Sequence, residues 1–393
     1  MAVNNMSINE QAYTLLASLH QQATGEAGIT PTDLSSFISV AQSTLLAGND
    51  AILNALSVMV SDTIFSVRPY SRKFAGLLYD TREYGGIIRK IQFEDVDPEA
   101  SSVYALVDGA SIDQYVVKKP KVLQTNYVGS VEWASHYSIT RDQLKVAFES
   151  PAGLMDFFST LMTSFANQRE QWLEEYARAA LCNFIAAKNV MGGTYDVIHL
   201  LTEYNTVTGA SPAFTAQTIR QPENFPGFMK WAYGRIADLC DKMTERSELF
   251  QQVFTGHRIM RHTPLANQKF YMLSEFLRAM EAEVLADTYH ENFLRYSDVE
   301  SVGYWQAIEN PDEIQVTPVY TDASGAPATG AAQTMTDVIG VVFDRNAVGY
   351  NIYDDTMEST AYNPAGKYYN LWAHTRIQWQ NDVSEKGFVL VLD

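Results

Sequence analysis

The chain has little that would support thiol or metal chemistry. Only two of its 393 residues are cysteines, Cys182 and Cys240, and they lie too far apart in the sequence to form a CxxC pair. A disulfide framework and a thiolate metal site are therefore disfavoured, and two buried thiols are expected. The seven histidines are scattered, and the five-residue spacing of His257 and His262 suits neither a helix face nor one side of a strand. We predict no metal site and no cofactor.

Positive charge is missing from the beginning of the sequence. No Lys or Arg occurs between Met1 and Val67, and the whole chain has a formal net charge of −18. A secretory signal needs a basic segment and a transit peptide needs arginines, so neither is expected. A basic arm that would neutralise packaged nucleic acid is also missing. The apolar run Ala51–Val60 is much shorter than the roughly 20 residues needed to cross a bilayer, so no membrane association is predicted.

The familiar catalytic motifs are missing as well. The sequence has no GxSxG, GxxxxGK[ST], HExxH or GxGxxG pattern. Asp344–Gly349 begins like a calcium loop but places Val348 where an oxygen ligand is required, so we expect a strand-to-turn corner there. Asp354 and Asp355 are expected to be solvated rather than to form an acid/base pair. We predict no catalytic residue, although an active site assembled from distant residues stays open as an alternative.

What the sequence does contain favours a large core and wide contact surfaces. Hydrophobic residues make up 46% of the chain and charged residues 19%, and there are 22 Tyr, 19 Phe and 6 Trp. Tyr and Trp in particular are enriched where proteins contact one another. The first 60 residues have helical spacing, as at Tyr13, Leu16 and Leu19, between breakers. They predict a helical N-terminal arm with little core of its own, or alternatively an ordinary helical subdomain.

From Tyr84 the hydrophobic period changes to two, which is typical of strands. In the first strand pattern, Ile87, Ile91 and Phe93 share one side, opposite Lys90, Gln92 and Glu94. A polar stretch follows, and then a second strand pattern over Lys121–Thr140, in which Trp133 and Tyr137 share a side. Together these patterns predict an extended two-stranded arm over 84–140. Since an isolated hairpin is marginal in water, such an arm needs a surface to lie on.

The next segment predicts one helix over Ser150–Asn189, about 57 Å long at about 1.5 Å per residue. Ser150 is a suitable N-cap and Pro151 a suitable first helical residue. An apolar stripe recurs every three or four residues, and the glycines at 192 and 193 mark the end. A coiled coil is the main alternative, but the stripe is interrupted over 167–171 and charge pairing along it is sparse.

Residues 194–339 predict a compact α/β region with helices from Pro226 and over Ser274–Leu294. The small polar residues of 321–337 predict a mobile surface loop. Strand patterns return in the tail, from Val338 to the last residue.

This order of elements resembles the major capsid proteins of tailed bacteriophages, which have the Hong Kong 97-like head fold. Three stretches are also similar in sequence to members of that family: SITRDQLKVAFESPAGLMDFF, VGYWQAIENPDEIQVTPVY and VIGVVFDRNAVGYNIYDDTMESTAYNPAGKYYNLWAH. The resemblance covers about residues 60 to 393. It implies an α+β capsid fold divided as follows: a helical N-terminal arm (1–60), the start of a peripheral domain (61–83), an extension loop (84–140), peripheral domain with a spine helix (141–193, helix 150–189), an axial domain (194–339) and return strands of the peripheral domain (340–393).

The resemblance also implies a structural protein and not an enzyme. It would self-assemble into hexamers and pentamers of an icosahedral virion shell, put together in the host cytoplasm, that encloses double-stranded DNA without binding it specifically. A separate scaffolding protein and a portal would be further partners. Some family members cross-link through a Lys–Asn bond, but we cannot match that set of residues and predict no cross-link. An encapsulin-type compartment shell is the alternative within the same fold. The residues predicted to contact a neighbouring copy are Lys118, Lys119, Lys121, Tyr127, Trp133 and Tyr137.

Overall fold

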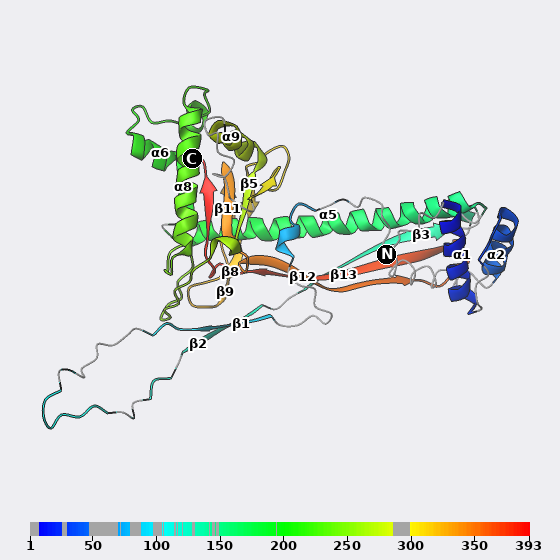
Figure 1. Cartoon of the computed structure of the whole chain (residues 1–393), viewed down its shortest axis with the longest axis horizontal. Helices are drawn as coiled ribbons and strands as arrows, with labels where there is room; N and C mark the ends of the chain where they lie inside the picture. Colours follow the sequence, from blue (N-terminus) through cyan, green and yellow to red (C-terminus); the bar gives the residue numbers. More distant parts are fainter. Residues whose placement is uncertain are drawn as a thin grey trace.

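The structure of the chain, a computed structural model, has three parts that differ in shape (Figure 1). A compact block has helix α8 (Phe225–Thr244) along one side, a long flat limb follows helix α5 (Pro151–Met191), and a thin arm leaves the block. The structure describes the whole chain except residues 1–7, 26–29, 47–69, 71, 79–87, 97–103, 105, 114, 116, 120, 128–129, 141, 144–145, 147–148, 194 and 286–298. Most of 61–83, predicted to begin the peripheral domain, therefore lies outside the described residues.

Helix α5 is the long helix that the sequence predicts. It runs for 41 residues, and the Ser150 side chain caps it by accepting a hydrogen bond from the Gly153 N–H at 3.1 Å. Gly192 ends it with a φ of 64°, a left-handed conformation that glycine adopts without strain. The helix continues past Asn189 to Met191 because the residue that stops it is this glycine.

Replacing Ser150 with Ala should lower the free energy of unfolding by about 1 kcal/mol, because an orphan N–H of the first turn then loses its partner. Urea unfolding followed by circular dichroism measures the change. Ser159→Ala is the matched control within the same helix, since the Ser159 hydroxyl only donates to the Asp156 carbonyl. That control should be neutral or slightly stabilising. Equal losses in both variants would contradict a capping role for Ser150.

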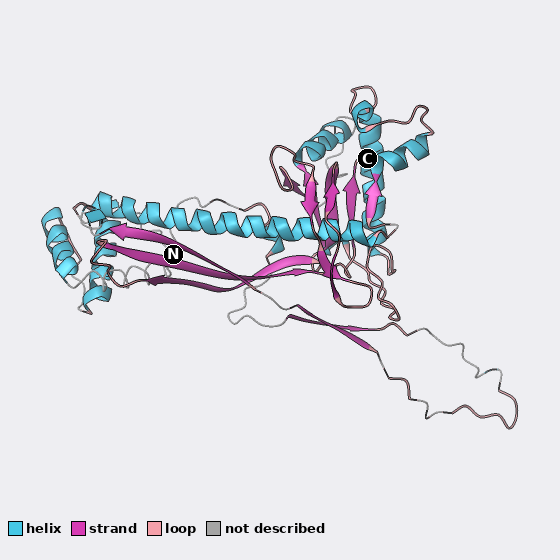
Figure 2. Cartoon of the chain, turned by 180° about the vertical axis from the view of Figure 1, so that it is seen from behind, coloured by secondary structure: helices cyan, strands magenta, loops and turns pink. Residues whose placement is uncertain are grey.

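A three-stranded antiparallel sheet lies along α5 and forms the limb (Figure 2). Its order is β12 (Val348–Ser359), β13 (Tyr368–Asn381) and β3 (Val131–Thr140). The apolar stripe of α5 packs on this sheet: the rings of Trp133 and Trp172 are 5.3 Å apart, and those of Tyr137 and Phe165 are 4.6 Å apart. The stripe thus faces a sheet, and toward the start of the helix it also meets the N-terminal helices.

The position of β3 corrects the prediction of a two-stranded arm over 84–140. β3 pairs with β13 along its whole length, from Val131 opposite Ile377 to Thr140 opposite Tyr368. The arm hairpin consists instead of β1 (Ile88–Phe93) and β2 (Val122–Tyr127). The aromatic side of β3 can be buried by the chain's own helix, so this strand has no need of a neighbouring copy.

The compact block is built on a mixed five-stranded sheet that is buried on both faces. Its order is β4 (Val197–His199), β14 (Gly387–Val391), β11 (Val338–Asp344), β5 (Gln268–Leu273) and β6 (Val299–Val302). One face packs on helices α6 (Leu200–Thr208), α8 and α9 (Ser274–Leu285). The other face packs on the second half of α5. The short helix α7 (Ala216–Ile219) connects α6 and α8.

The division of the tail differs from the predicted one. β11 and β14 belong to the sheet of the compact block, so 340–393 does not return as a whole to the peripheral sheet; only β12 and β13 do. All residues of β11 are buried, which indicates a central strand but not the sheet to which it belongs. The predicted helix over Ser274–Leu294 is described as far as Leu285, and 286–298 lie outside the described residues.

The segment after Tyr320, predicted to be a mobile loop, is paired instead. β8 (Val319–Thr321) and β9 (Pro327–Thr329) form a hairpin, and β10 (Gln333–Met335) pairs with β7 (Ile314–Val316). Asn183 of α5 holds the hairpin by donating to the Val319 carbonyl at 2.9 Å and accepting from its N–H at 2.8 Å. The sequence pattern does not reveal these contacts with the long helix, because small polar residues are also typical of a surface loop.

The N-terminal helices α1 (Ile8–Thr24) and α2 (Leu34–Leu46) pack at the far end of the limb (Figure 1). Their buried residues share one cluster with α5, β3 and β13, whose members include Leu16, Leu19, Phe37, Phe165, Tyr369 and Leu371. In the described ranges these helices therefore extend the core of the limb. The apolar run Ala51–Val60 lies outside the described residues. The helices and separate sheets together make the α+β class that the sequence predicts.

Candidate assembly surfaces

The described residues offer no chemical centre. Nowhere among them do three or more His, Cys, Asp or Glu side chains gather as metal ligands would. Cys182 and Cys240 are free and buried, and burial raises the pKa of each thiol to about 12, which keeps both unreactive near neutral pH. Among the helices that the structure describes, none has the length and apolar character that a bilayer crossing requires.

The acidic residues considered from the sequence have structural partners. Asp344 lies at the corner between β11 and β12, where it accepts from the Thr263 hydroxyl at 2.8 Å and from the Asn346 N–H at 2.9 Å. This is the strand-to-turn corner that the sequence predicts. Asp355 forms an ion pair with Arg169 of α5 at 2.6 Å. Asp354 and Asp355 are both exposed, as the sequence predicts.

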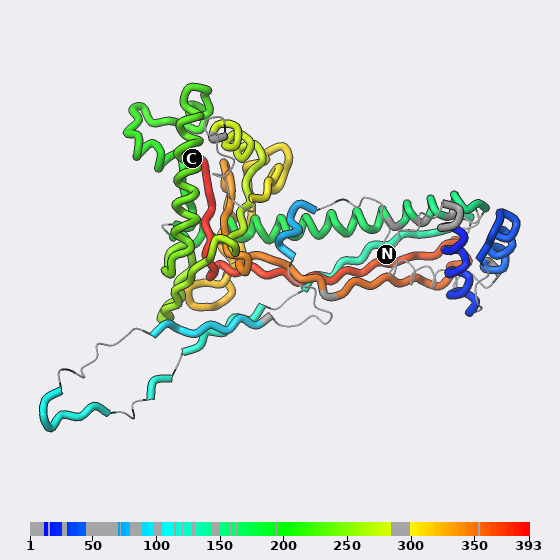
Figure 3. Tube along the Cα trace, viewed as in Figure 1, coloured from blue at the N-terminus to red at the C-terminus, as the bar shows by residue number. Residues whose placement is uncertain are grey.

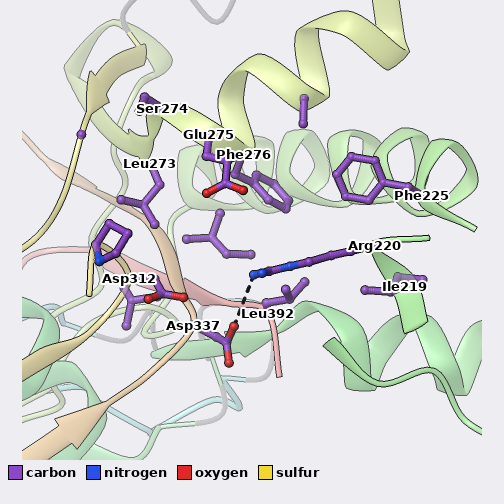
Figure 4. A pocket seen from close by; sticks show the side chains of 15 residues that line it. Ile219, Arg220, Phe225, Leu273, Ser274, Glu275, Phe276, Asp312, Asp337 and Leu392 are labelled. Atoms are coloured by element: carbon purple, nitrogen blue, oxygen red, sulfur yellow. Dashed lines mark ion pairs between the residues drawn. The ribbon is translucent and has the colours of Figure 1, made fainter. Parts of the chain in front are cut away.

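A cavity of about 650 Å³ lies in the compact block between α9 and the last strand (Figure 4). Arg220 and Asp337 form an ion pair across it at 3.5 Å, and Asp312 and Glu275 also line it. Burial, followed by the nearby charge of Asp312, raises the pKa of Asp337, while Arg220 opposes the shift. The cavity has an aromatic wall formed by Phe225 and Phe276.

One face of the arm hairpin exposes large apolar side chains. β1 and β2 pair so that Phe93 is opposite Val122 and Ile91 is opposite Gln124. Ile91, Phe93 and Val122 are 57%, 64% and 48% exposed. We call the side that they occupy the outer arm face; its members are Arg89, Ile91, Phe93, Val122, Gln124 and Asn126. Three large apolar side chains are therefore exposed on this face, together with three polar ones.

The opposite side of the hairpin faces the body of the molecule, and it combines polar residues such as Lys90 with Leu123 and Tyr127. Lys90 contacts both Asp382 and Glu385, and the Gln378 amide donates to the Tyr127 carbonyl at 3.1 Å. Large apolar side chains that remain exposed together often mark a contact with a partner, and the outer arm face carries three of them.

Beyond the hairpin, the arm extends away from the body (Figure 3). Several large side chains of its described part are exposed: Tyr104, Val107, Ile112, Tyr115 and Val117. The predicted contact residues Lys118, Lys119 and Lys121 lie at the return from this tip into β2, and all three are exposed. Lys121 forms an ion pair with Glu94 within the arm, at 3.3 Å. The arm thus presents an apolar surface of considerable length with lysines at its edge.

The three aromatic residues predicted as contacts have different positions. Tyr127 lies in β2 on the side that faces the body, where burial, followed by the charge of Asp382, raises the pKa of its phenol. Trp133 and Tyr137 are not part of the arm: they lie in β3 and pack on the chain's own helix α5. The grouping of these two with the arm is therefore corrected.

The sequence did not identify Val122 as a member of the outer arm face. It also did not identify Asp382 and Glu385 as the body residues that contact Lys90. The period-two pattern did place Ile91 and Phe93 on one side and Lys90 on the other. That alternation was the available signal, but it does not tell which side faces inward.

The sequence model of the Phi29-like phage major capsid protein family matches residues 16–380 of the chain. The chain belongs to the Phi29-like phage major capsid protein family. Between the two shell proteins considered from the sequence, this match selects the phage capsid over the encapsulin-type compartment. No curated protein shows significant sequence similarity to this member of the Phi29-like family.

Solved structures support the same fold. A chain of the Staphylococcus phage Andhra capsid structure is similar to this one with a TM-score of 0.55 at 10% identity, covering 84% of this chain and 87% of that chain. A chain in the structure of the head fibre and inner core protein of native bacteriophage P68 has a TM-score of 0.55 at 9% identity, with the same two coverages. Such identities establish the Hong Kong 97-like fold alone, while family membership establishes a tailed-phage major capsid protein. It is a structural protein of the virion and part of a multi-subunit shell.

Proposed function

We propose that copies of this chain form hexamers and pentamers of an icosahedral shell, in which the arm of each copy lies on the next copy. The observation that carries the proposal is the outer arm face, on which the large apolar side chains of Ile91, Phe93 and Val122 stay about half exposed or more in the single chain. A two-stranded hairpin is marginally stable alone, so an exposed apolar face on one favours burial at a contact. Identical copies supply that contact repeatedly under closed symmetry.

The charge of the chain supports a container that does not bind its cargo. At a net charge of −18, phosphate is repelled on average, and counterion release by a basic surface cannot drive specific binding. We therefore infer that the shell encloses double-stranded DNA that enters through a portal and is not attracted by the wall. Assembly in the host cytoplasm on a separate scaffolding protein completes the proposal. It assigns the chain no catalytic activity and no cofactor.

The purified full chain tests the shell directly. Negative-stain microscopy and sedimentation of the protein, alone and mixed with the scaffolding protein of the same phage, should reveal hollow shells or rings of five and six copies. Contacts of standard size, about 1,600 Å² each, are enough to hold such rings at micromolar concentrations. A chain that sediments as a monomer in every mixture would rule the proposal out.

A further inference from the structure

The root of the arm is attached to the body by charge. Lys90 of β1 contacts Asp382 and Glu385, both in the turn between β13 and β14. Arg261 of the body contacts Glu385 and also the Gln92 side chain of the arm. A lysine of the arm thus contacts two carboxylates of the body, and an arginine of the body contacts a side chain of the arm. Polar contacts therefore connect the arm and the body in both directions.

A second row of polar contacts lies at the end of β1. Asp95 donates its N–H to the Arg258 carbonyl at 2.8 Å and accepts from the Met260 N–H, also at 2.8 Å. Its carboxylate contacts Arg246 as well. We call the two rows together the arm clasp; its members are Lys90, Gln92 and Asp95 on the arm and Arg246, Arg258, Met260, Arg261, Asp382 and Glu385 on the body.

The central charges of the arm clasp are shielded from water. The side chains of Lys90, Asp382, Glu385 and Arg261 are 20%, 5%, 13% and 11% exposed. Burial alone would raise the pKa of Asp382, but Lys90, Ser384 and Arg261 together outweigh it and hold that pKa below its ordinary value. Shielded ion pairs are sensitive to geometry, because a displaced partner leaves a charge both buried and uncompensated.

We propose that Lys90 and Asp382 are positioning residues that fix the direction in which the arm leaves the body before it meets a second copy. This inference rests on the proposed function, in which the arm docks on the next copy. An apolar attachment would bury the outer arm face against the chain's own body and compete with docking. An ionic attachment through the opposite side holds the arm while Ile91 and Phe93 stay available.

Lys90→Met tests the inference, with Lys121→Met as the matched control. Both substitutions remove one positive charge from the arm, but Lys121 pairs with Glu94 of the arm itself and is 67% exposed. Spin labels at Gln124→Cys on the outer arm face and Thr206→Cys on α6 report the direction of the arm, since the natural cysteines are buried. The measurement uses the full chain below the concentration at which shells form.

The distances between the two spin labels should have a narrow distribution in the parent protein and in Lys121→Met. In Lys90→Met the distribution should be broad. Amide exchange in β1 and β2 should also accelerate by about tenfold or more in Lys90→Met, because breaking a buried pair by removing one partner costs several times the thermal energy. Arg246→Gln, which removes a partly exposed contact of the second row, provides a variant that keeps the core intact. Unchanged distributions in both Lys90→Met and Arg246→Gln would overturn the inference.

Assembly of the same variants separates this inference from the proposed function. If the arm of Lys90→Met is loose and shells still form normally, the clasp is correct and docking by the arm is not. If the arm distribution is unchanged while Ile91 and Phe93 prove essential for shells, docking is correct and the clasp is not.

Discussion

Replacing Ile91 and Phe93 together with Asp should abolish shell assembly and leave the isolated chain folded. Both side chains are more than half exposed in the single chain, so the monomer loses little, within about 0.5 kcal/mol for each substitution. Under the proposed docking the same positions are covered in the shell, and each new carboxylate would be desolvated without a partner. That penalty amounts to several kcal/mol at every copy of the contact. Sedimentation and electron microscopy measure assembly, and circular dichroism checks the fold.

The matched control for this prediction is Asn126→Asp on the same outer arm face. It adds negative charge without removing apolar area, and Asp can still accept the hydrogen bond that the Gln124 amide donates to residue 126 at 2.8 Å. The control should form shells, because an exposed charge changes a contact by about 1 kcal/mol or less. Loss of assembly in the control alone, or shells from the double variant at the parent concentration, would show that the outer arm face is not an apolar contact.

The long helix could be predicted because all of its signals are local. The Ser150 cap, the Pro151 start and the Gly192 end are each decided within one turn of chain. Its apolar stripe gave the buried side but not the partner. That the partner is a sheet depends on β13, which lies far away in the sequence: the hydrogen-bonded pair Ser138 and Asn370 is 232 residues apart. No local pattern specifies such pairing.

The same limit explains the error over β3. A strand with alternating aromatic residues has the same sequence pattern whether it covers its own helix or a neighbour's. For the arm, alternation correctly separated Ile91 and Phe93 from Lys90, but both faces of the hairpin carry apolar or aromatic residues, so the rule that apolar residues face inward does not choose a side. Under the proposed docking, the face that stays exposed in the single chain is the one that a neighbouring copy covers.

Replacing Trp133 with Ala should destabilise the isolated chain, whereas replacing an exposed residue of the arm should leave its stability nearly unchanged. The Trp133 ring lies 5.3 Å from that of Trp172 and 5.2 Å from that of Tyr176, in an edge-on arrangement with the tyrosine. Truncating a tryptophan within a packed cluster lowers the free energy of unfolding by about 3–5 kcal/mol, and we expect the lower end because the side chain is half-buried. Urea unfolding followed by circular dichroism measures the loss.

Two further variants decide whether this loss reports packing on α5. Trp372→Ala, on the neighbouring strand, removes a ring whose closest aromatic neighbour is His136 at 4.3 Å, and it should destabilise less. The double variant of Trp133 and Trp172 should lose less than the sum of the two single losses, by about 0.5–1.5 kcal/mol, since the rings contact each other. If Trp133→Ala unfolds like the parent chain but forms no shells, Trp133 acts between copies. Assembly assays on Trp133 variants are informative only once this stability measurement has been made.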